Sequence, residues 1–145
     1  MRVMALDIGD VRIGVALSDP LLLTAQGLRT IHRSNIRKDT SEIIEIIKEE
    51  GVTELIIGLP VSLSGEDTEQ TEKIRSFATK LENKMRSSGL KDIIVAYSDE
   101  RFSSVIANNV LLEADVKRQD RKNVIDKMAA SVILQSYLDH KNISK

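Results

Sequence analysis

The sequence predicts one α/β domain over residues 1–145, built on a mixed five-stranded sheet with helices on both of its faces. Three observations lead to this fold class. Residues 2–8 are almost continuously apolar, as in a strand that is covered on both faces. Residues 12–18 alternate apolar with polar or small side chains, and Gly9-Asp10 between the two segments favours a hairpin. Two later apolar strands alternate with helices, which predicts parallel crossover connections.

The first half of the chain supplies four strands and one helix. After the hairpin, residues 27–32 read as a third strand. Asp39 followed by Glu42 three positions later predicts a helix that starts at Asp39 and ends near Gly51. Residues 54–57 begin with Glu54, continue with three apolar residues and are followed by Gly58 and Pro60, so they are expected to form the fourth strand.

The second half alternates helix and strand again. A helix is predicted to end at Gly89, and its apolar face has 3.6-residue periodicity: Ile74, Phe77, Ala78, Leu81 and Met85. The stretch "KDIIVAYSDE" is expected to be the fifth strand. Ser103 or Ser104 then caps a predicted helix, and a last helix is expected over residues 121–138. Its predicted inner stripe is Ile125, Ala129, Val132, Ile133 and Ser136.

Composition limits the chemistry that the chain can perform. Among 145 residues there is no cysteine and there are only two histidines, so thiol nucleophiles, thiolate metal sites and histidine-built metal sites are disfavoured. The net charge of -1 gives no overall attraction to nucleic acid, so a polyanionic partner would need a local basic patch. No stretch has the length and apolarity of a signal peptide or a membrane span, and we expect a cytoplasmic protein that does not bind membranes.

Acidic residues follow the ends of the predicted parallel strands. Asp7 ends the first strand, Asp99 and Glu100 end the fifth, and Asp126 lies near the start of the last helix. Carboxyl ends of parallel strands share one edge of a sheet, where sites collect. Each acid also has a structural explanation: Asp7 could cap the hairpin turn, Asp126 could favour the helix dipole, and the acidic pair could be a solvated strand end.

Together, the acids indicate a metal site. A carboxylate in a buried strand is costly unless it is paired, hydrogen-bonded or bound to metal. Oxygen ligands without His or Cys suit Mg²⁺ or Mn²⁺. Two such ions about 3.5–4 Å apart would activate a water and stabilise the leaving oxygen of a phosphodiester. The spacing therefore favours phosphodiester hydrolysis.

The whole chain resembles the YqgF family, whose members are described as pre-16S rRNA nucleases or as Holliday junction resolvase-like proteins. The resemblance rests on "LDIGDVRIGVALSD", "IIGLP", "DERFSS" and "RKNVIDKMAASVILQSYL", which occur in this order. It implies a ribonuclease H-like fold and a divalent-metal-dependent enzyme that trims the 5′ end of precursor 16S rRNA. Resolution of branched DNA is the alternative that the resemblance carries. The segment after "GLP" is acidic and polar and departs from the family pattern.

The resemblance also implies roles for individual residues. The metal ligands and catalytic acids would be Asp7, Glu100 and Asp126, with Asp99 as the less favoured alternative to Glu100. Contacts to substrate phosphates are assigned to four basic side chains: Arg101, Arg118, Arg121 and Lys122. Three of these four belong to the basic stretch at residues 117–122, whose simplest explanation is a solvated loop. We expect phosphate binding because this stretch leads directly into the helix that carries Asp126.

Two other classes of protein compete with the nuclease interpretation. Actin-like proteins and sugar kinases also begin with an Asp-x-Gly strand, but they need a second glycine-rich phosphate loop and a second domain, which this chain lacks. A non-catalytic nucleic-acid-binding or ribosome-assembly module would keep the fold without the chemistry. Few aromatic side chains are available for stacking on bases, which favours recognition of the backbone, or specificity supplied by a ribosomal particle.

Overall fold

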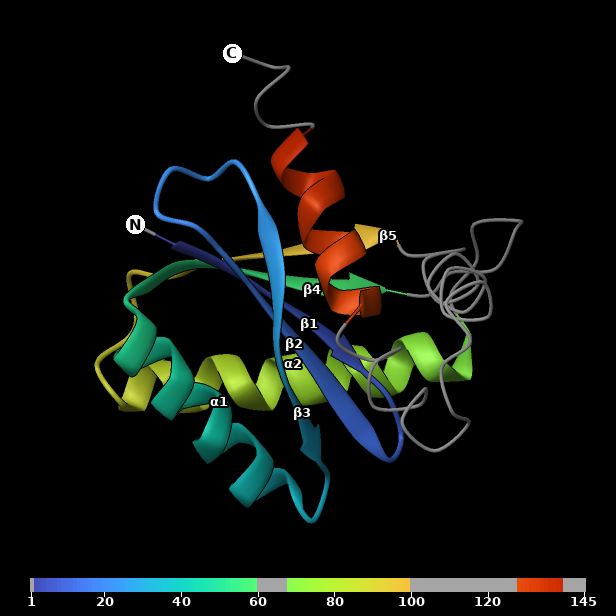
Figure 1. The fold of residues 1–145 in the computed structure, drawn as a ribbon. Coiled ribbons are helices and arrows are strands. Elements are labelled where there is room, and N and C mark those ends of the chain that lie inside the picture. Colours follow the sequence, from blue (N-terminus) through green and yellow to red (C-terminus); the bar gives the residue numbers. More distant parts are fainter. Residues whose placement is uncertain (1, 60–67, 100–127, 140–145) are drawn as a thin grey trace.

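A five-stranded sheet forms the centre of the molecule (Figure 1). The computed structural model describes residues 2–59, 68–99 and 128–139. The strand order is β3-β2-β1-β4-β5. The strands are β1 (Arg2–Ile8), β2 (Arg12–Ser18), β3 (Ala25–His32), β4 (Val52–Leu59) and β5 (Ile94–Asp99). All five predicted strands are present, although β3 and β4 start two residues earlier than expected. β4 also continues through Gly58 to Leu59, where the sequence predicted a break.

The sheet is mixed, as the sequence predicts. β1 pairs antiparallel with β2, and β2 pairs antiparallel with β3, so the first three strands form a meander. β1 and β4 are parallel, as are β4 and β5. The parallel half therefore has three strands whose carboxyl ends reach the same edge, and this edge positions the candidate site.

Helix α1 (Ile36–Glu50) begins earlier than predicted. Its N-cap is Asn35, whose side chain accepts a hydrogen bond from the Lys38 amide at 2.9 Å. The prediction that Asp39 caps this helix is wrong, because Asp39 lies inside the first turn and is only 2% exposed. Gly51 ends the helix in the left-handed conformation, with φ of 65°.

Helix α2 (Glu69–Ser87) runs along the same face of the sheet as α1. Thr68 and Thr71 form a reciprocal capping box at its start. The predicted apolar face is correct, since Ile74, Phe77 and Leu81 are all buried. Gly89 follows the helix end with φ of 83°, a conformation that glycine adopts without a steric penalty.

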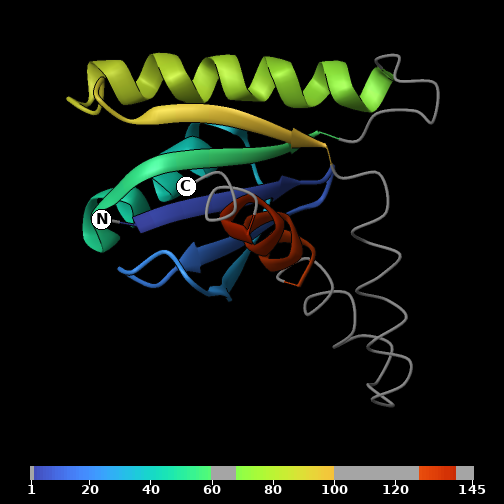
Figure 2. The ribbon, with the colours of Figure 1, turned by 90° about the horizontal axis from the view of Figure 1, so that it is seen from above.

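Residues 128–139 form a helix on the opposite face of the sheet (Figure 2). Its buried side chains are Ala129, Ala130, Ile133, Leu134 and Leu138. The predicted inner stripe is partly wrong: Val132 is half-buried and Ser136 is exposed. The stripe is rotated toward Ala130 and Leu134, which pack on Val3 and Ala5 of β1. The predicted helix after Ser103 and residues 121–127 of the last helix lie outside the described residues.

Within the described parts of the chain, no helix is long and apolar enough to cross a membrane.

Candidate active site at the carboxyl edge of the sheet

The carboxyl ends of β1, β4 and β5 lie side by side at one edge of the sheet. Leu6 of β1 is in register with Ile57 of β4, and Leu59 of β4 is in register with Asp99 of β5. Asp7 follows Leu6 and is the last residue but one of β1. The structure therefore brings Asp7 and the end of β5 to one edge, as the sequence predicts.

Asp7 belongs to the face of β1 that packs against the helix of residues 128–139. Val3 and Ala5 lie in the hydrophobic cluster with this helix, and side chains alternate between faces along a strand. Asp7 is the next member of that row and is half-buried. An apolar row that ends in a partly exposed carboxylate is the arrangement predicted from the sequence.

Glycines on the two neighbouring strands flank Asp7. Gly14 of β2 is directly opposite Asp7 in the antiparallel ladder. On the other side, the register that pairs Leu6 with Ile57 continues to Gly58 of β4, which is buried. Neither neighbour has a side chain beyond Cα, so the carboxylate of Asp7 is not crowded from either strand.

The helix of residues 128–139 is oriented with its start toward this edge. The Tyr137 hydroxyl donates a 2.6 Å hydrogen bond to Glu54, which lies near the beginning of β4. The Gln135 side chain accepts a hydrogen bond from the Ala25 amide and donates one to the Leu23 carbonyl. These contacts fix the C-terminal half of the helix over the beginnings of β3 and β4. The first turn of the helix therefore points to the edge that carries Asp7 (Figure 2).

Most of the predicted site residues lie outside the described residues. Asp7 is described with its side chain, and Asp99 is described as the last residue of the β5 backbone. The other positions are outside: Glu100, Arg101, Arg118, Arg121, Lys122 and Asp126. No group of three or more acidic or histidine side chains that could hold a metal ion occurs among the described residues.

A comparison with known proteins identifies the family. A family model described as "RuvX: Holliday junction resolvase" matches residues 1–140. The chain belongs to this family. It is 48% identical to a protein of Desulforamulus reducens named "Putative pre-16S rRNA nuclease", over 96% of this chain and 97% of that protein. A protein of Moorella thermoacetica with the same name is also 48% identical, over 96% of this chain and 95% of that protein.

Solved structures similar to this RuvX family member establish its fold. RuvC of T. thermophilus in complex with a Holliday junction substrate has a TM-score of 0.61 at 12% identity, covering 98% of this chain and 96% of that chain. The Fowlpox virus resolvase in complex with Holliday junction DNA has a TM-score of 0.58 at 12% identity, covering 97% and 99%. The predicted ribonuclease H-like fold is therefore confirmed.

The turn after Asp7 is held by features that the sequence analysis only partly anticipated. The Gly9 amide donates a 2.8 Å hydrogen bond to the Arg12 carbonyl, which closes the hairpin between β1 and β2. A Cβ atom at position 9 would lie 2.9 Å from that same oxygen. Gly9 is therefore required by a close approach of backbone to backbone, as its place in the predicted turn suggested.

Arg33 fixes this turn from the α1 side and was missed by sequence reasoning. Its Nη1 donates a 2.8 Å hydrogen bond to the Gly9 carbonyl, and its Nε lies 3.3 Å from the carboxylate of Asp39. The guanidinium also lies over the ring of Phe77 in α2, 5.0 Å from its centre. One arginine thus joins the turn next to Asp7 to both helices of the other face. The only sequence signal was a basic residue just before a helix.

Arg12 is a second basic residue that the sequence analysis did not assign to the site. It lies on the same strand face as Gly14, the residue opposite Asp7. Its Nε is buried and has no hydrogen-bond partner within the described residues. The residue as a whole is half-buried, and a cationic side chain on the Asp7 face is suited to contact a substrate phosphate.

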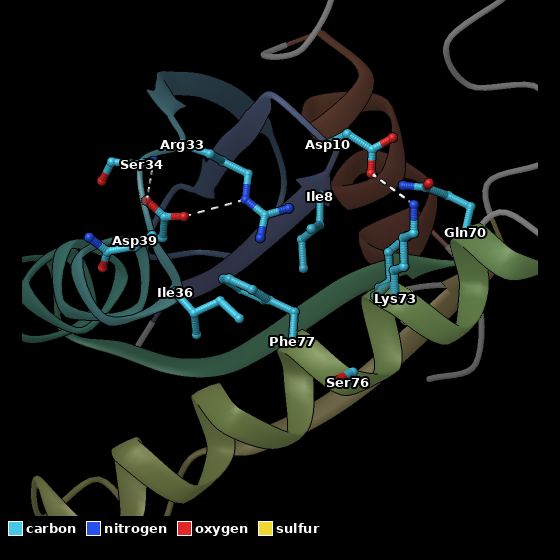
Figure 3. Close-up of a pocket in the computed structure, with 12 residues that line it drawn as sticks. Ile8, Asp10, Arg33, Ser34, Ile36, Asp39, Gln70, Lys73, Ser76 and Phe77 are labelled. Atoms are coloured by element: carbon cyan, nitrogen blue, oxygen red, sulfur yellow. Dashed lines mark hydrogen bonds and ion pairs between the residues drawn. The ribbon is translucent and has the colours of Figure 1, made fainter.

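A cavity of about 490 Å³ lies beside the same turn, between β1, α1 and α2 (Figure 3). Ile8 and Asp10, which flank Gly9, contribute to its wall. Side chains alternate along β1 and Ile8 packs in the cluster with α1 and α2, so the cavity opens on the other side of the sheet from Asp7. The two sides of one turn thus carry two different environments.

Proposed function

We propose that this protein is a metal-dependent nuclease that hydrolyses phosphodiester bonds in the 5′-end maturation of precursor 16S rRNA. The observation that carries the proposal is the place of Asp7: a half-buried carboxylate at the carboxyl edge of the sheet, between two glycines and facing the last helix. A carboxylate at this edge is suited to a divalent cation, because Mg²⁺ and Mn²⁺ take hard oxygen ligands.

The proposed ligands of Mg²⁺ or Mn²⁺ are Asp7, Glu100 and Asp126. Glu100 is preferred to Asp99 because the acid of the family motif, in the stretch "DERFSS", falls on position 100. Asp126 precedes by two residues the described start of the helix that points to Asp7. The chemistry that one or two such ions supply is activation of a water and stabilisation of the leaving oxygen.

The chain's basic residues would orient the substrate. Arg12 lies on the Asp7 face, and the proposal adds it to the four basic residues assigned from the sequence: Arg101, Arg118, Arg121 and Lys122. With a net charge of -1, the protein has no general attraction to polyanions. Local contacts of this kind would therefore supply the electrostatic part of binding and make it sensitive to salt.

The choice of ribosomal RNA rests on the names of the relatives, which are 48% identical over nearly the whole chain. The proposal accordingly includes a cytoplasmic location, where ribosomes are assembled, and a ribosomal particle as the possible carrier of the substrate. The second candidate is resolution of Holliday junctions, favoured by the description of the family model and by the fold shared with RuvC.

A side-by-side cleavage assay tests the proposal. The purified protein is incubated with precursor 16S rRNA or with a synthetic four-way DNA junction, in Mg²⁺, in Mn²⁺ or in EDTA. We expect metal-dependent cleavage of the RNA near its mature 5′ end and little cleavage of the junction. Cleavage of the junction alone would replace the first function by the second. A protein that cleaves neither substrate, free or in ribosomal particles, would contradict the nuclease assignment.

A further inference from the structure

We propose that the cavity beside the β1–β2 turn binds one base of a single-stranded nucleic acid whose backbone lies at the Asp7 edge. The proposal rests on the function proposed above and adds a second contact region to it. The volume of about 490 Å³ falls in the range of small-molecule pockets. The cavity is lined by the first half of α2, by the start of α1 with the three residues before it, and by the two residues that flank Gly9.

The charges of the cavity wall favour a neutral ligand over an anion. Arg33 is compensated by Asp39, with 3.3 Å between Nε and the carboxylate. Lys73 lies 4.0 Å from the carboxylate of Asp10. Lys73 also lies 3.9 Å from the carboxylate of Glu69. Both cations of the wall are therefore matched by carboxylates, and a free phosphate or a polyphosphate would find no net positive charge here. A base is neutral at pH 7, and its own phosphates would remain outside the cavity.

The shape and chemistry of the wall suit a flat, partly polar ring. Three buried apolar side chains line the cavity: Ile8, Ile74 and Phe77. Arg33 lies above the ring of Phe77 (Figure 3). Bases stack on guanidinium planes as well as on aromatic rings. Across the cavity, Gln70 and Lys73 present hydrogen-bonding groups, as the edge of a base requires.

The position of the cavity connects it to the proposed catalytic edge. Asp7 and Ile8 are adjacent residues whose side chains point to opposite faces of β1. The turn between β1 and β2 is therefore the boundary between the two regions, and Asp10 at this turn lies at the cavity. A single-stranded nucleic acid that follows the carboxyl edge of the sheet can keep one phosphate at Asp7. Its neighbouring base can then turn past Asp10 into the cavity.

Fluorescence of 2-aminopurine tests the proposal without relying on cleavage. A single 2-aminopurine is placed at each position in turn of a single-stranded RNA and of the matching DNA. Its fluorescence is measured with and without the protein, in EDTA. We expect one position to change its fluorescence strongly on binding, and the two series show whether RNA, DNA or both supply the base. An abasic site at that position should weaken binding about tenfold.

A pair of tryptophan variants provides the matched control. Ser76 is an exposed residue of α2 that lines the cavity, so Ser76→Trp is expected to fill it, to abolish the fluorescence change and to weaken binding about tenfold. Asn83→Trp adds the same ring at an exposed position two helical turns along α2, outside the cavity, and should behave like wild type. The abasic site should not weaken binding further in Ser76→Trp, because the two changes remove the same contact.

Either of two results would overturn the proposal: equal fluorescence at every position, or a position-specific change that survives in folded Ser76→Trp. Lys73→Met keeps the length of the side chain and should weaken the same fluorescence change without filling the cavity. The cavity and the nuclease assignment can fail separately. If cleavage is observed but no position changes its fluorescence, only the base-binding proposal is wrong. If one position changes its fluorescence but neither substrate is cleaved, only the nuclease assignment is wrong.

Discussion

The two faces of β1 differ in the size and chemistry of their side chains. Met4, Leu6 and Ile8 point into the large cluster with α1 and α2. Val3 and Ala5 point to the helix of residues 128–139, and this row ends in Asp7. Fully burying a large aliphatic side chain contributes about 1.5–3 kcal/mol, so the first face supplies most of the stability. The second face of β1 is built from smaller side chains and ends in the carboxylate.

Because the two faces of β1 differ in this way, we expect that stability and activity can be changed independently. Substitutions on the α1 and α2 face should lower the free energy of unfolding, and substitutions on the Asp7 face should lower cleavage. The four predictions below test this contrast, beginning with the largest expected effect.

Asp7→Asn should reduce cleavage on the order of a thousandfold, because loss of a metal ligand removes several kcal/mol of transition-state stabilisation. The melting temperature should stay the same or rise, since repulsion among close carboxylates decreases. Single-turnover cleavage and calorimetry measure the two effects. Asp92→Asn, an exposed aspartate before β5, is the matched control and should cleave like wild type. Wild-type cleavage by Asp7→Asn would refute the assignment.

Leu81→Ala and Leu134→Ala make the same change on opposite faces, at two side chains that are both 0% exposed. Each should destabilise the fold by about 3 kcal/mol, because a cavity replaces buried methyl groups. At a temperature where both variants are folded, Leu134→Ala should also cleave several-fold more slowly, since its helix leads to Asp126. Denaturant unfolding and cleavage rates provide the comparison. Equal cleavage by the two variants would show that the faces are not functionally distinct.

Arg33→Ala should destabilise the protein by about 2 kcal/mol, because the Gly9 carbonyl and the buried carboxylate of Asp39 each lose a charged hydrogen-bond donor. Arg33→Lys keeps the charge but cannot reach both acceptors with one planar group, and it should recover less than half of the loss. The midpoint of urea unfolding measures both variants. If the lysine variant were as stable as wild type, the forked geometry would be irrelevant.

Tyr137→Phe should have the smallest effect, about 1 kcal/mol, from loss of the hydrogen bond to Glu54. Burial, together with that hydrogen bond, raises the pKa of Tyr137 to about 12 from 10.0. The stabilisation by Tyr137 is therefore complete below pH 10 and decreases as the pH rises toward 12. Unfolding of both proteins across this window should show their difference shrinking, and a constant difference would contradict this cause.

Strand patterns carried most of the fold information in the sequence. Apolar alternation located β1, β2 and the edge at which Asp7 lies, because each face of a strand must match its surroundings. The start of α1 was predicted incorrectly, since Asn35 and Asp39 are both good capping residues and the tertiary contact of Asp39 with Arg33 decided between them. The stripe of the last helix was also partly wrong, because apolar periodicity fixes a helix face only to within about one position.

The candidate site was predictable in its chemistry and less so in its surroundings. A carboxylate at the end of a buried strand is visible in the sequence, whereas the Arg33 contacts join residues 9, 33, 39 and 77, which no local pattern relates. The four basic residues assigned to phosphate contacts and the ligands Glu100 and Asp126 stay predictions. The cavity beside Asp10 could not be read from the sequence at all, since it depends on how three elements pack.

The side chain of Gln135 fixes the position of the last helix along its own axis. Its amide accepts from the Ala25 amide and donates to the Leu23 carbonyl, as a neighbouring peptide group would. One residue inserted between Met128 and Gln135 would move every earlier position by about 1.5 Å and turn it by about 100°. The spacing from this glutamine to the proposed ligand Asp126 should therefore tolerate substitutions but not changes of length.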